Sequence, residues 1–419
     1  MKSPVSSYGR VNGLSRIGDL LRLYMFPWLA FYVSDGNPAD KVLFITTAAF
    51  LQAIPSLMLS HFAARFVRRF SPLQSSIWAN GGMGVLSLLT ALVVLGGGAN
   101  KLFVLLMWVL FGVFEVVYYP ARDCLYAVLA AGNDKAREEA NRSSVSIYHI
   151  GRATMSVAFL AIVWLLGPVK EELPRSAIAI ALLFDAVTFG VVVAFLLTLR
   201  KGTYVPNREE GQGRSKLSLQ ETAQVPGAIP ILICILALYS FAYSSFFFNF
   251  GFYKEFVGVG EQERQLTFYI AMLAAACGGF FGGQVWKASF RNLVLGMVAV
   301  CVTEGMLAFV PTNHFWGTIW LACNSCLSIM LFTIVFDGIV PQLVQGLDRN
   351  AEVSASINLV KEGLSPILVV AVSAIASCLN APRQVLLGAC SLALVIVVVT
   401  LFTRRASIQR VIDGAPAMN

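Results

Sequence analysis

Long apolar runs alternate with short polar segments along almost the entire chain. Twelve of these runs reach the length of about 20 residues that a helix needs to cross the hydrocarbon core of a bilayer. The predicted spans lie near residues 14–33, 42–63, 74–96, 102–120, 142–166, 176–199, 228–253, 265–286, 290–311, 315–338, 354–379 and 384–403. The pattern therefore predicts an all-α integral membrane protein, in which lipid rather than water surrounds most helices.

The longest polar segment separates the predicted spans into two groups of six. Segments 143–151 and 355–363, one in each group, share a serine, a β-branched residue and a glycine at matching offsets. Internal repeats of this kind are typical of transporters built from two bundles. We therefore expect the chain to be organised as a six-helix bundle, a cytoplasmic central loop, a second six-helix bundle and a cytoplasmic tail, at residues 1–199, 200–226, 227–405 and 406–419.

The composition supports this class and excludes others. Hydrophobic residues make up 57% of the 419 residues and charged residues 13%, whereas a soluble domain has about a quarter charged residues. Such a chain is not a disordered, collagen-like or coiled-coil protein. The 8 cysteines lie mostly inside apolar runs, where we expect small packing residues rather than disulfides or metal ligands. No cleavable signal peptide is expected, because the first apolar run lacks a small-residue cleavage site.

The distribution of lysine and arginine predicts the orientation in the membrane. With both termini in the cytoplasm, 21 of the 31 basic residues lie on the cytoplasmic side, 7 lie outside and 3 lie within the membrane. This bias follows the positive-inside rule. The net charge of +8 is therefore explained by orientation, and no nucleic-acid partner is expected.

Several charged residues fall within predicted spans. A formal charge at the bilayer centre costs roughly 2.5–3.5 kcal/mol on insertion scales, so such residues usually face a cavity or a partner. Asp19 and Arg22 are three residues apart, on one face of a helix. Asp19 is either a proton carrier controlled by the guanidinium or half of a structural ion pair. Glu115 and Asp185 are isolated acids in apolar runs, and we predict that they also take part in proton coupling.

Arg152 lies near the middle of the fifth predicted span, with His149 one turn before it. A guanidinium stays protonated and holds an anion through a forked pair of hydrogen bonds. We therefore predict that Arg152 binds a substrate anion or pairs with Asp19 or Glu115, the alternative being an interhelical lock. His149 is either a proton relay or a structural residue.

Three further residues complete the predicted substrate-binding set. Asn249 is the polar residue in the aromatic seventh span, Glu304 lies in the outer part of the ninth span, and Arg22 adds a second cation. Aromatic walls stack bulky ligands but also pack and anchor helices. Glu304 either faces a vestibule or is structural.

A second group of charges lies at the predicted cytoplasmic ends of the spans. Lys361 and Glu362 are adjacent in the eleventh span, and Asp337 lies at the inner end of the tenth. We predict that they form a gate or lock together with three basic residues after the second span, Arg65, Arg68 and Arg69.

The loop after the second span carries a family resemblance. The major facilitator superfamily has Gly, three residues, Asp-Arg, one residue and then Gly-Arg-Arg or Gly-Arg-Lys, and this chain has Ser60-His-Phe-Ala-Ala-Arg-Phe-Val-Arg-Arg69. The three basic residues match, whereas Ser60, Ala64 and Val67 replace both glycines and the acid. The chain resembles this superfamily in its layout of six and six spans, which implies two bundles that rock about a central cavity.

Within the superfamily the first half resembles the macrolide-efflux and enterobactin-exporter branch. The matching segments are Ile17-Gly18-Asp19, Phe26-Pro27-Trp28-Leu29, Pro120-Ala121-Arg122-Asp123 and Ala140-Asn141-Arg142-Ser143. The Gly-Pro of antiporters in the fifth span is Gly151-Arg152 here. The resemblance implies export of a drug-like compound or a siderophore by proton antiport.

These observations leave three transport hypotheses open. The first is an exporter of an amphipathic or anionic small molecule, coupled to protons; the others are proton-coupled import of a siderophore or nutrient, and movement of a lysolipid or lipid. An enzyme is not expected, because the chain has no P-loop, no H-E-x-x-H sequence and no Cys/His cluster. We expect a monomer in the bacterial inner membrane, with no cofactor and no metal.

Overall fold

The computed structural model describes residues 4–33, 38–130, 133–166, 175–201, 222, 227–238, 261–284, 289–309, 314–333, 350–379 and 382–412. Within these ranges the chain is almost wholly helical, and none of these residues lies in a strand. The predicted all-α class is thereby confirmed. A helix overlaps every predicted span, and four helices of the described part are long and apolar enough to cross a membrane: Pro72–Leu95, Lys101–Ala130, Arg175–Arg200 and Val353–Val372. The count of twelve spans stays a prediction.

The helices start where the sequence supplies proline or a capping side chain. Proline occupies the first position of several helices, where its missing N–H costs no hydrogen bond. Ser71 and Ser289 cap helices by accepting hydrogen bonds from Gln74 N and Asn292 N. These caps satisfy amide groups that a helix leaves without an internal partner.

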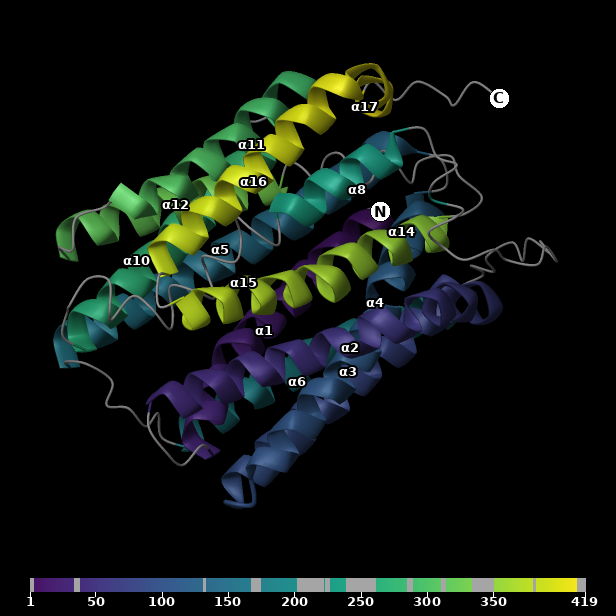
Figure 1. The fold of residues 1–419 in the computed structure, drawn as a ribbon. Helices are drawn as coiled ribbons and strands as arrows, with labels where there is room; N and C mark the ends of the chain where they lie inside the picture. The colour runs from purple at the N-terminus through teal and green to yellow at the C-terminus, as the bar shows by residue number, and fades with distance from the viewer. Residues whose placement is uncertain are drawn as a thin grey trace. The chain divides into compact units, whose positions relative to one another are not determined.

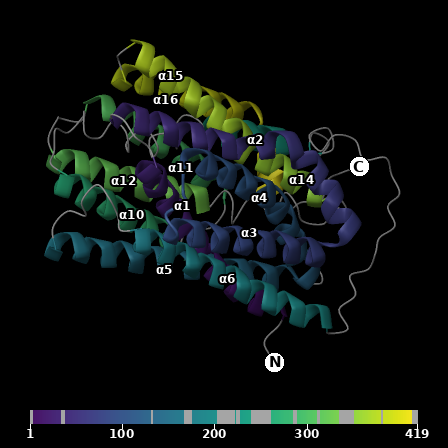
Figure 2. The same cartoon turned by 90° about the horizontal axis from the view of Figure 1, so that it is seen from below.

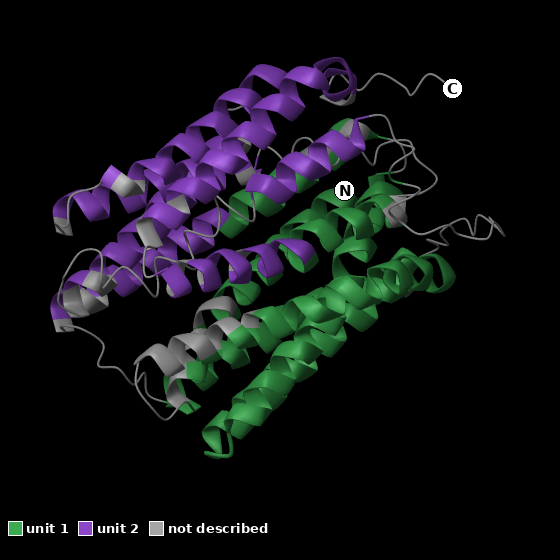
Figure 3. Ribbon diagram, viewed as in Figure 1, with its two compact units in different colours: residues 1–148, 170–224, 344–363 green, residues 149–169, 225–343, 364–419 purple. Residues whose placement is uncertain are grey.

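The structure divides into two compact units, each made of several chain segments (Figure 3). Unit 1 comprises residues 1–148, 170–224 and 344–363, and unit 2 comprises 149–169, 225–343 and 364–419. Helix α5 (Asp134–Leu166) contributes to both units. A second helical run also contributes to both units. It starts with α14 (Asn350–Asn358), continues through a π-helical turn η4 (Leu359–Leu364) and ends with α15 (Ser365–Leu379). The predicted bundles 1–199 and 227–405 stay a prediction.

Unit 1 holds most of the charged residues discussed below. Its helices are α1 (Pro4–Val33), α2 (Pro38–Phe70), α3 (Pro72–Leu95), α4 (Lys101–Ala130), α6 (Arg175–Lys201), the start of α5, and α14. Helix α3 packs along α6, α2 along α4, and α1 against α6 (Figures 1 and 2). Helix α14 packs against both α2 and α4. Residues near the middle of α1, α4 and α6 can therefore meet inside this unit.

Unit 2 contains the remaining helices. They are α8 (Ala228–Ala237), α10 (Glu261–Gln284), α11 (Phe290–Gly305), the short η2 (Met306–Phe309), α12 (His314–Thr333), α15, α16 (Pro382–Thr403) and α17 (Arg405–Ile412). Helix α10 packs along α12, and α16 packs against α8, α11 and α15. The second part of α5, from His149, belongs to this unit.

Candidate functional site

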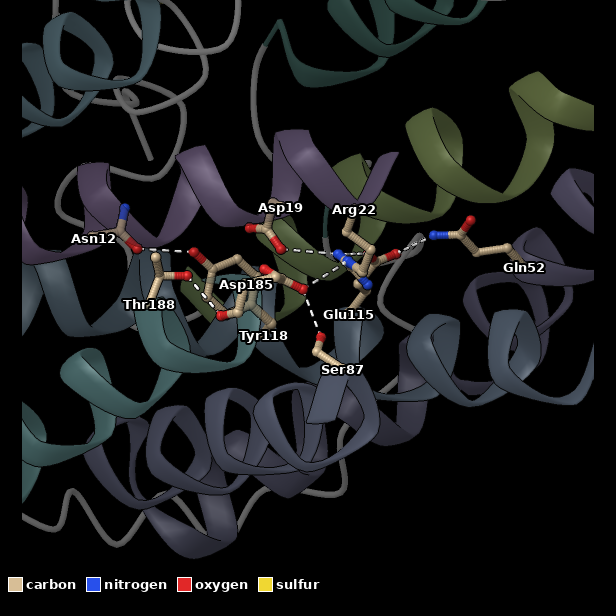
Figure 4. A network of polar contacts seen from close by, with 9 residues as sticks. All are labelled: Asn12, Asp19, Arg22, Gln52, Ser87, Glu115, Tyr118, Asp185 and Thr188. Carbon is tan, nitrogen blue, oxygen red and sulfur yellow. Dashed lines mark hydrogen bonds and ion pairs between the residues drawn. The ribbon is translucent and has the colours of Figure 1, made fainter. Parts of the chain in front are cut away.

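A buried charge cluster lies inside unit 1, where α1, α4 and α6 meet (Figure 4). The Nη2 atom of Arg22 lies 2.9 Å from Oδ1 of Asp19 and 2.8 Å from Oε1 of Glu115. Its Nε atom lies 3.7 Å from Oδ2 of Asp185. One guanidinium thus contacts three carboxylates that come from three different helices, and it also lies over the ring of Phe111 at 4.2 Å.

Neutral side chains from two further helices bind the same carboxylates. Gln52 of α2 donates from Nε2 to Oε2 of Glu115 at 2.7 Å. Ser87 of α3 donates from Oγ to Oδ2 of Asp185 at 2.6 Å. These two partners were not predicted from the sequence, although an amide and a hydroxyl inside apolar spans are a signal that could have found them.

Close packing between α1 and α6 brings Asp185 to this cluster. A Cβ atom on Gly18 would lie 2.6 Å from Oδ1 of Asp185 and would also overlap Oγ1 of Thr188. Thr188 in turn donates to the backbone carbonyl of Asp185 at 2.7 Å. Glycine beside Asp19 therefore allows α6 to approach α1 closely enough for its acid to reach Arg22.

The charges of this cluster do not balance if every group is ionised. One guanidinium offsets one of the three carboxylates that surround it. The side chain of Asp185 is fully buried, whereas that of Asp19 is 25% exposed. Because an uncompensated buried charge is costly, such a site favours the binding of a cation. A proton is the smallest cation.

A neutral network lies beside the cluster in unit 1. Tyr118 donates to Oδ1 of Asn12 at 2.8 Å, and Nδ2 of Asn12 donates to Tyr126 at 3.3 Å and to Ser144 at 3.2 Å. Three helices, α1, α4 and the start of α5, are joined in this way. The network fixes the position of α1 two turns before Asp19.

Arg152 and His149 lie in unit 2, and both are buried. Arg152 contacts the sulfur of Met272 on α10, with Nη2 and Sδ 3.6 Å apart. The ring of His149 packs directly on Gly279, where any added Cβ would overlap it. A glycine in α10 thus makes room for the imidazole. Asp19 and Glu115, the two acids considered as partners for Arg152, both contact the guanidinium of Arg22.

Glu304 is also buried in unit 2, and its carboxylate accepts a hydrogen bond from Nδ2 of Asn324 at 2.6 Å. Near it, the indole of Trp320 donates to the carbonyl of Thr303 at 2.7 Å. These contacts join α11 to α12. Two other predicted site residues, Asn249 and Asp337, lie outside the described residues.

The predicted gate residues of the eleventh span lie in the π-helical turn η4. Lys361 and Glu362 form an ion pair at 2.6 Å, and the Lys361 ammonium lies 5.0 Å from the ring centre of Tyr119 on α4. Beyond them, Ser354 of α14 donates to Oδ2 of Asp123 at 2.6 Å, while Arg122 binds Oδ1 of the same carboxylate. The contact between Asp123 and Ser354 was not predicted from the sequence.

An apolar cluster occupies the place where the superfamily motif has its acid and second glycine. Ala64 and Val67 of α2 are buried against α4 and α14, together with Ala121, Cys124, Ala351 and Ala355. The neighbouring residues Arg65, Arg68 and Arg69 are exposed. The contact between α2 and α14 in this chain is therefore made by small apolar side chains.

Comparison with known proteins identifies the fold. No family model matches the sequence, and no curated protein matches it. The solved structure of the fucose:proton symporter FucP of E. coli superposes with a TM-score of 0.66 at 14% identity, over 96% of this chain and 98% of that chain. FucP in the outward conformation gives a TM-score of 0.67 at 14% identity over the same shares. The nucleoside transporter NupG gives 0.59 at 11% identity, over 95% and 98%.

The chain therefore has the fold of major facilitator superfamily transporters. Together with its long apolar helices, this fold is that of an integral multi-pass membrane protein.

Proposed function

We propose that this chain is a secondary transporter whose solute movement is coupled to protons through Asp19, Glu115 and Asp185. The observation that carries the proposal is the contact of three carboxylates with the single guanidinium of Arg22. A site with more acids than bases, buried between helices of a transporter fold, changes its proton content when its surroundings change. Transport is proposed rather than catalysis because the superposed proteins are transporters.

The direction proposed is export by proton antiport, with a drug-like compound or a siderophore as the solute. The support for export is the resemblance of the first half to efflux proteins, in which Ile17-Gly18-Asp19 supplies both the acid and the glycine that packs on α6. Arg152 in unit 2 supports an anionic or amphipathic solute, because a buried guanidinium binds anions well. We further propose a monomer in the bacterial inner membrane.

Proton-coupled import is the second candidate. It is favoured by the likeness in fold to a fucose:proton symporter. Import and export use the same carboxylates and differ in whether solute and proton move in the same direction. One measurement therefore separates the two candidates.

The test uses purified protein in liposomes that contain a pH-sensitive dye. Amphipathic drugs, siderophores and lysolipids are screened for solute-triggered proton flux. We expect flux opposite to the solute for the wild type and no coupled flux for Asp19→Asn or Asp185→Asn. The matched control is Glu139→Gln, which removes an exposed acid of α5 and should retain the flux.

The other outcomes are equally informative. Flux in the same direction as the solute would establish import on the same fold. Solute movement without any proton flux, or normal coupling in both Asp variants, would contradict the assignment of the carboxylates.

A further inference from the structure

The chain turns sharply after α16 and forms the short helix α17. In Figure 1, α16 is seen along its length, whereas α17 is seen nearly end-on. The side chain of Ile408 on α17 is fully buried, and α17 packs against α8, α11 and α16. Since α16 is predicted to be a span that ends in the cytoplasm, we expect α17 to lie at the cytoplasmic surface of the membrane.

Helix α17 and the residue before it carry exposed arginines. Arg404, Arg405 and Arg410 are exposed, and Arg405 lies 5.5 Å from the ring centre of Phe290 at the start of α11. The next residue, Arg291, is exposed as well. We define the basic patch by these four arginines. The sequence has no acidic residue between 382 and 412 or between 285 and 303, so the positive charge of the patch is not offset by these segments.

Apolar side chains lead to this patch along two helices of unit 2. On α16, Leu392, Val395, Val399 and Phe402 are each more than half exposed and recur every three or four residues. This spacing puts them on one face of the helix, and Arg404 follows the last of them by two residues along the chain. On α11, Leu295 and Val302 are about half exposed and follow Arg291. An apolar face that ends in exposed cations matches the shape of a phospholipid.

We propose that the basic patch binds the headgroup of an anionic phospholipid, whose acyl chains lie along the exposed faces of α11 and α16. Basic clusters directly beyond a membrane span attract anionic lipids by about 1 kcal/mol per lysine or arginine. The exposed apolar stripes favour a lipid over a free phosphate ion, because only a lipid covers both the stripes and the arginines. Helix α17 is then a lipid-binding element, separate from the charge cluster of unit 1.

The experiment measures thermal unfolding of the full-length protein in neutral detergent micelles with added phosphatidylglycerol or phosphatidylcholine. A ligand that binds only the folded state raises the unfolding midpoint, and the rise grows with the logarithm of the ratio of ligand concentration to dissociation constant. We expect phosphatidylglycerol to raise the midpoint and phosphatidylcholine to leave it unchanged. The triple variant Arg404→Gln, Arg405→Gln, Arg410→Gln should bind phosphatidylglycerol about 100-fold more weakly.

A matched control removes three other exposed basic residues of the predicted cytoplasmic side, Arg10, Lys135 and Arg200, by the same change to glutamine. This variant should keep the preference for phosphatidylglycerol. If the first triple variant does not fold, the corresponding lysine variant and the wild type at high salt replace it. Lysine should retain the effect and salt should weaken it.

Three results would overturn the proposal. Equal stabilisation by both lipids would show that headgroup charge is not recognised. Equal losses in the two triple variants would show a general effect of net charge. Equal stabilisation by glycerophosphoglycerol, which has the phosphodiester headgroup without acyl chains, would show an anion site that does not require lipid.

Discussion

Arg22 is the residue on which the charge cluster depends. Its spacing from Asp19 predicted their ion pair, because residues three apart on a helix share a face. The spacing could not predict that Glu115 and Asp185 reach the same guanidinium, since that contact depends on how α4 and α6 pack on α1. Gln52 and Ser87 could have been noticed as polar residues inside apolar spans, but the acids that they bind depend on helix packing in the same way. Local periodicity predicts which residues are buried but not which helices become neighbours.

Replacing Arg22 by methionine should destabilise the protein by about 3–5 kcal/mol, because three buried or half-buried carboxylates would lose their cation. Thermal or denaturant unfolding in detergent measures the loss. Lysine at the same position should restore part of the stability. The double variant Arg22→Met, Glu115→Gln should be more stable than Arg22→Met alone, and a double variant that is no better would show that charge imbalance is not the cause.

Gly18 controls how closely α1 and α6 approach each other. Alanine at this position would overlap Asp185 and Thr188, and overpacking of this kind costs about 1–3 kcal/mol. We expect a lower unfolding midpoint together with weaker proton coupling. Gly190 of α6 is the matched control, because a Cβ there meets no atom within 4 Å. Gly190→Ala should be neutral or slightly stabilising, and equal losses at both positions would contradict the packing argument.

At the scale of elements, α14 is the helix whose contacts were hardest to predict. The sequence predicted one continuous span over 354–379, and the structure has a helix from 350 that passes through the π-helical turn η4. Turns of this kind are frequent at functional sites in helices. The sequence signal was present in Lys361 and Glu362, but the partner helices α2 and α4 come from the other half of the chain. Long-range pairing of this kind has no local pattern.

The hydrogen bond between Ser354 and Asp123 should hold α14 against α4. Its loss in Ser354→Ala removes a bond to a charged group, worth about 1.5–3 kcal/mol. Cys124 lies buried in the apolar cluster with Ala351 and Ala355, so it reports on this contact. In a variant with Cys124 as its only cysteine, maleimide labelling should accelerate at least about tenfold when Ser354 is replaced.

The control for this measurement is Ser391→Ala, which changes an exposed serine of α16 and should leave the labelling rate as it is. Ser354→Asp should label faster than Ser354→Ala, because it puts two carboxylates side by side. An unchanged rate in both Ser354 variants would show that this bond does not hold the helix.

At the scale of the whole molecule, the apolar pattern predicted the fold well. Every predicted span overlaps a described helix, because a chain of this composition must satisfy its backbone hydrogen bonds inside each span. Two segments were noted for their similarity. Segment 143–151 contains the point where α5 passes from unit 1 to unit 2, and segment 355–363 ends where the α14–α15 run does the same. The contacts that hold each unit together join distant parts of the chain, and such contacts have no local sequence pattern.

Orientation in the membrane is the prediction that concerns the entire chain. The excess of 21 basic residues inside over 7 outside predicts cytoplasmic termini. Lys135 then lies in the cytoplasm and Lys101 outside, and both are exposed. In a background without native cysteines, a membrane-impermeant maleimide added to intact cells should label Lys101→Cys and should leave Lys135→Cys unlabelled until the cells are opened. The reverse pattern would invert the predicted topology. Labelling of both positions in intact cells would show that the residues between them do not cross the membrane an odd number of times, which would contradict the predicted span count.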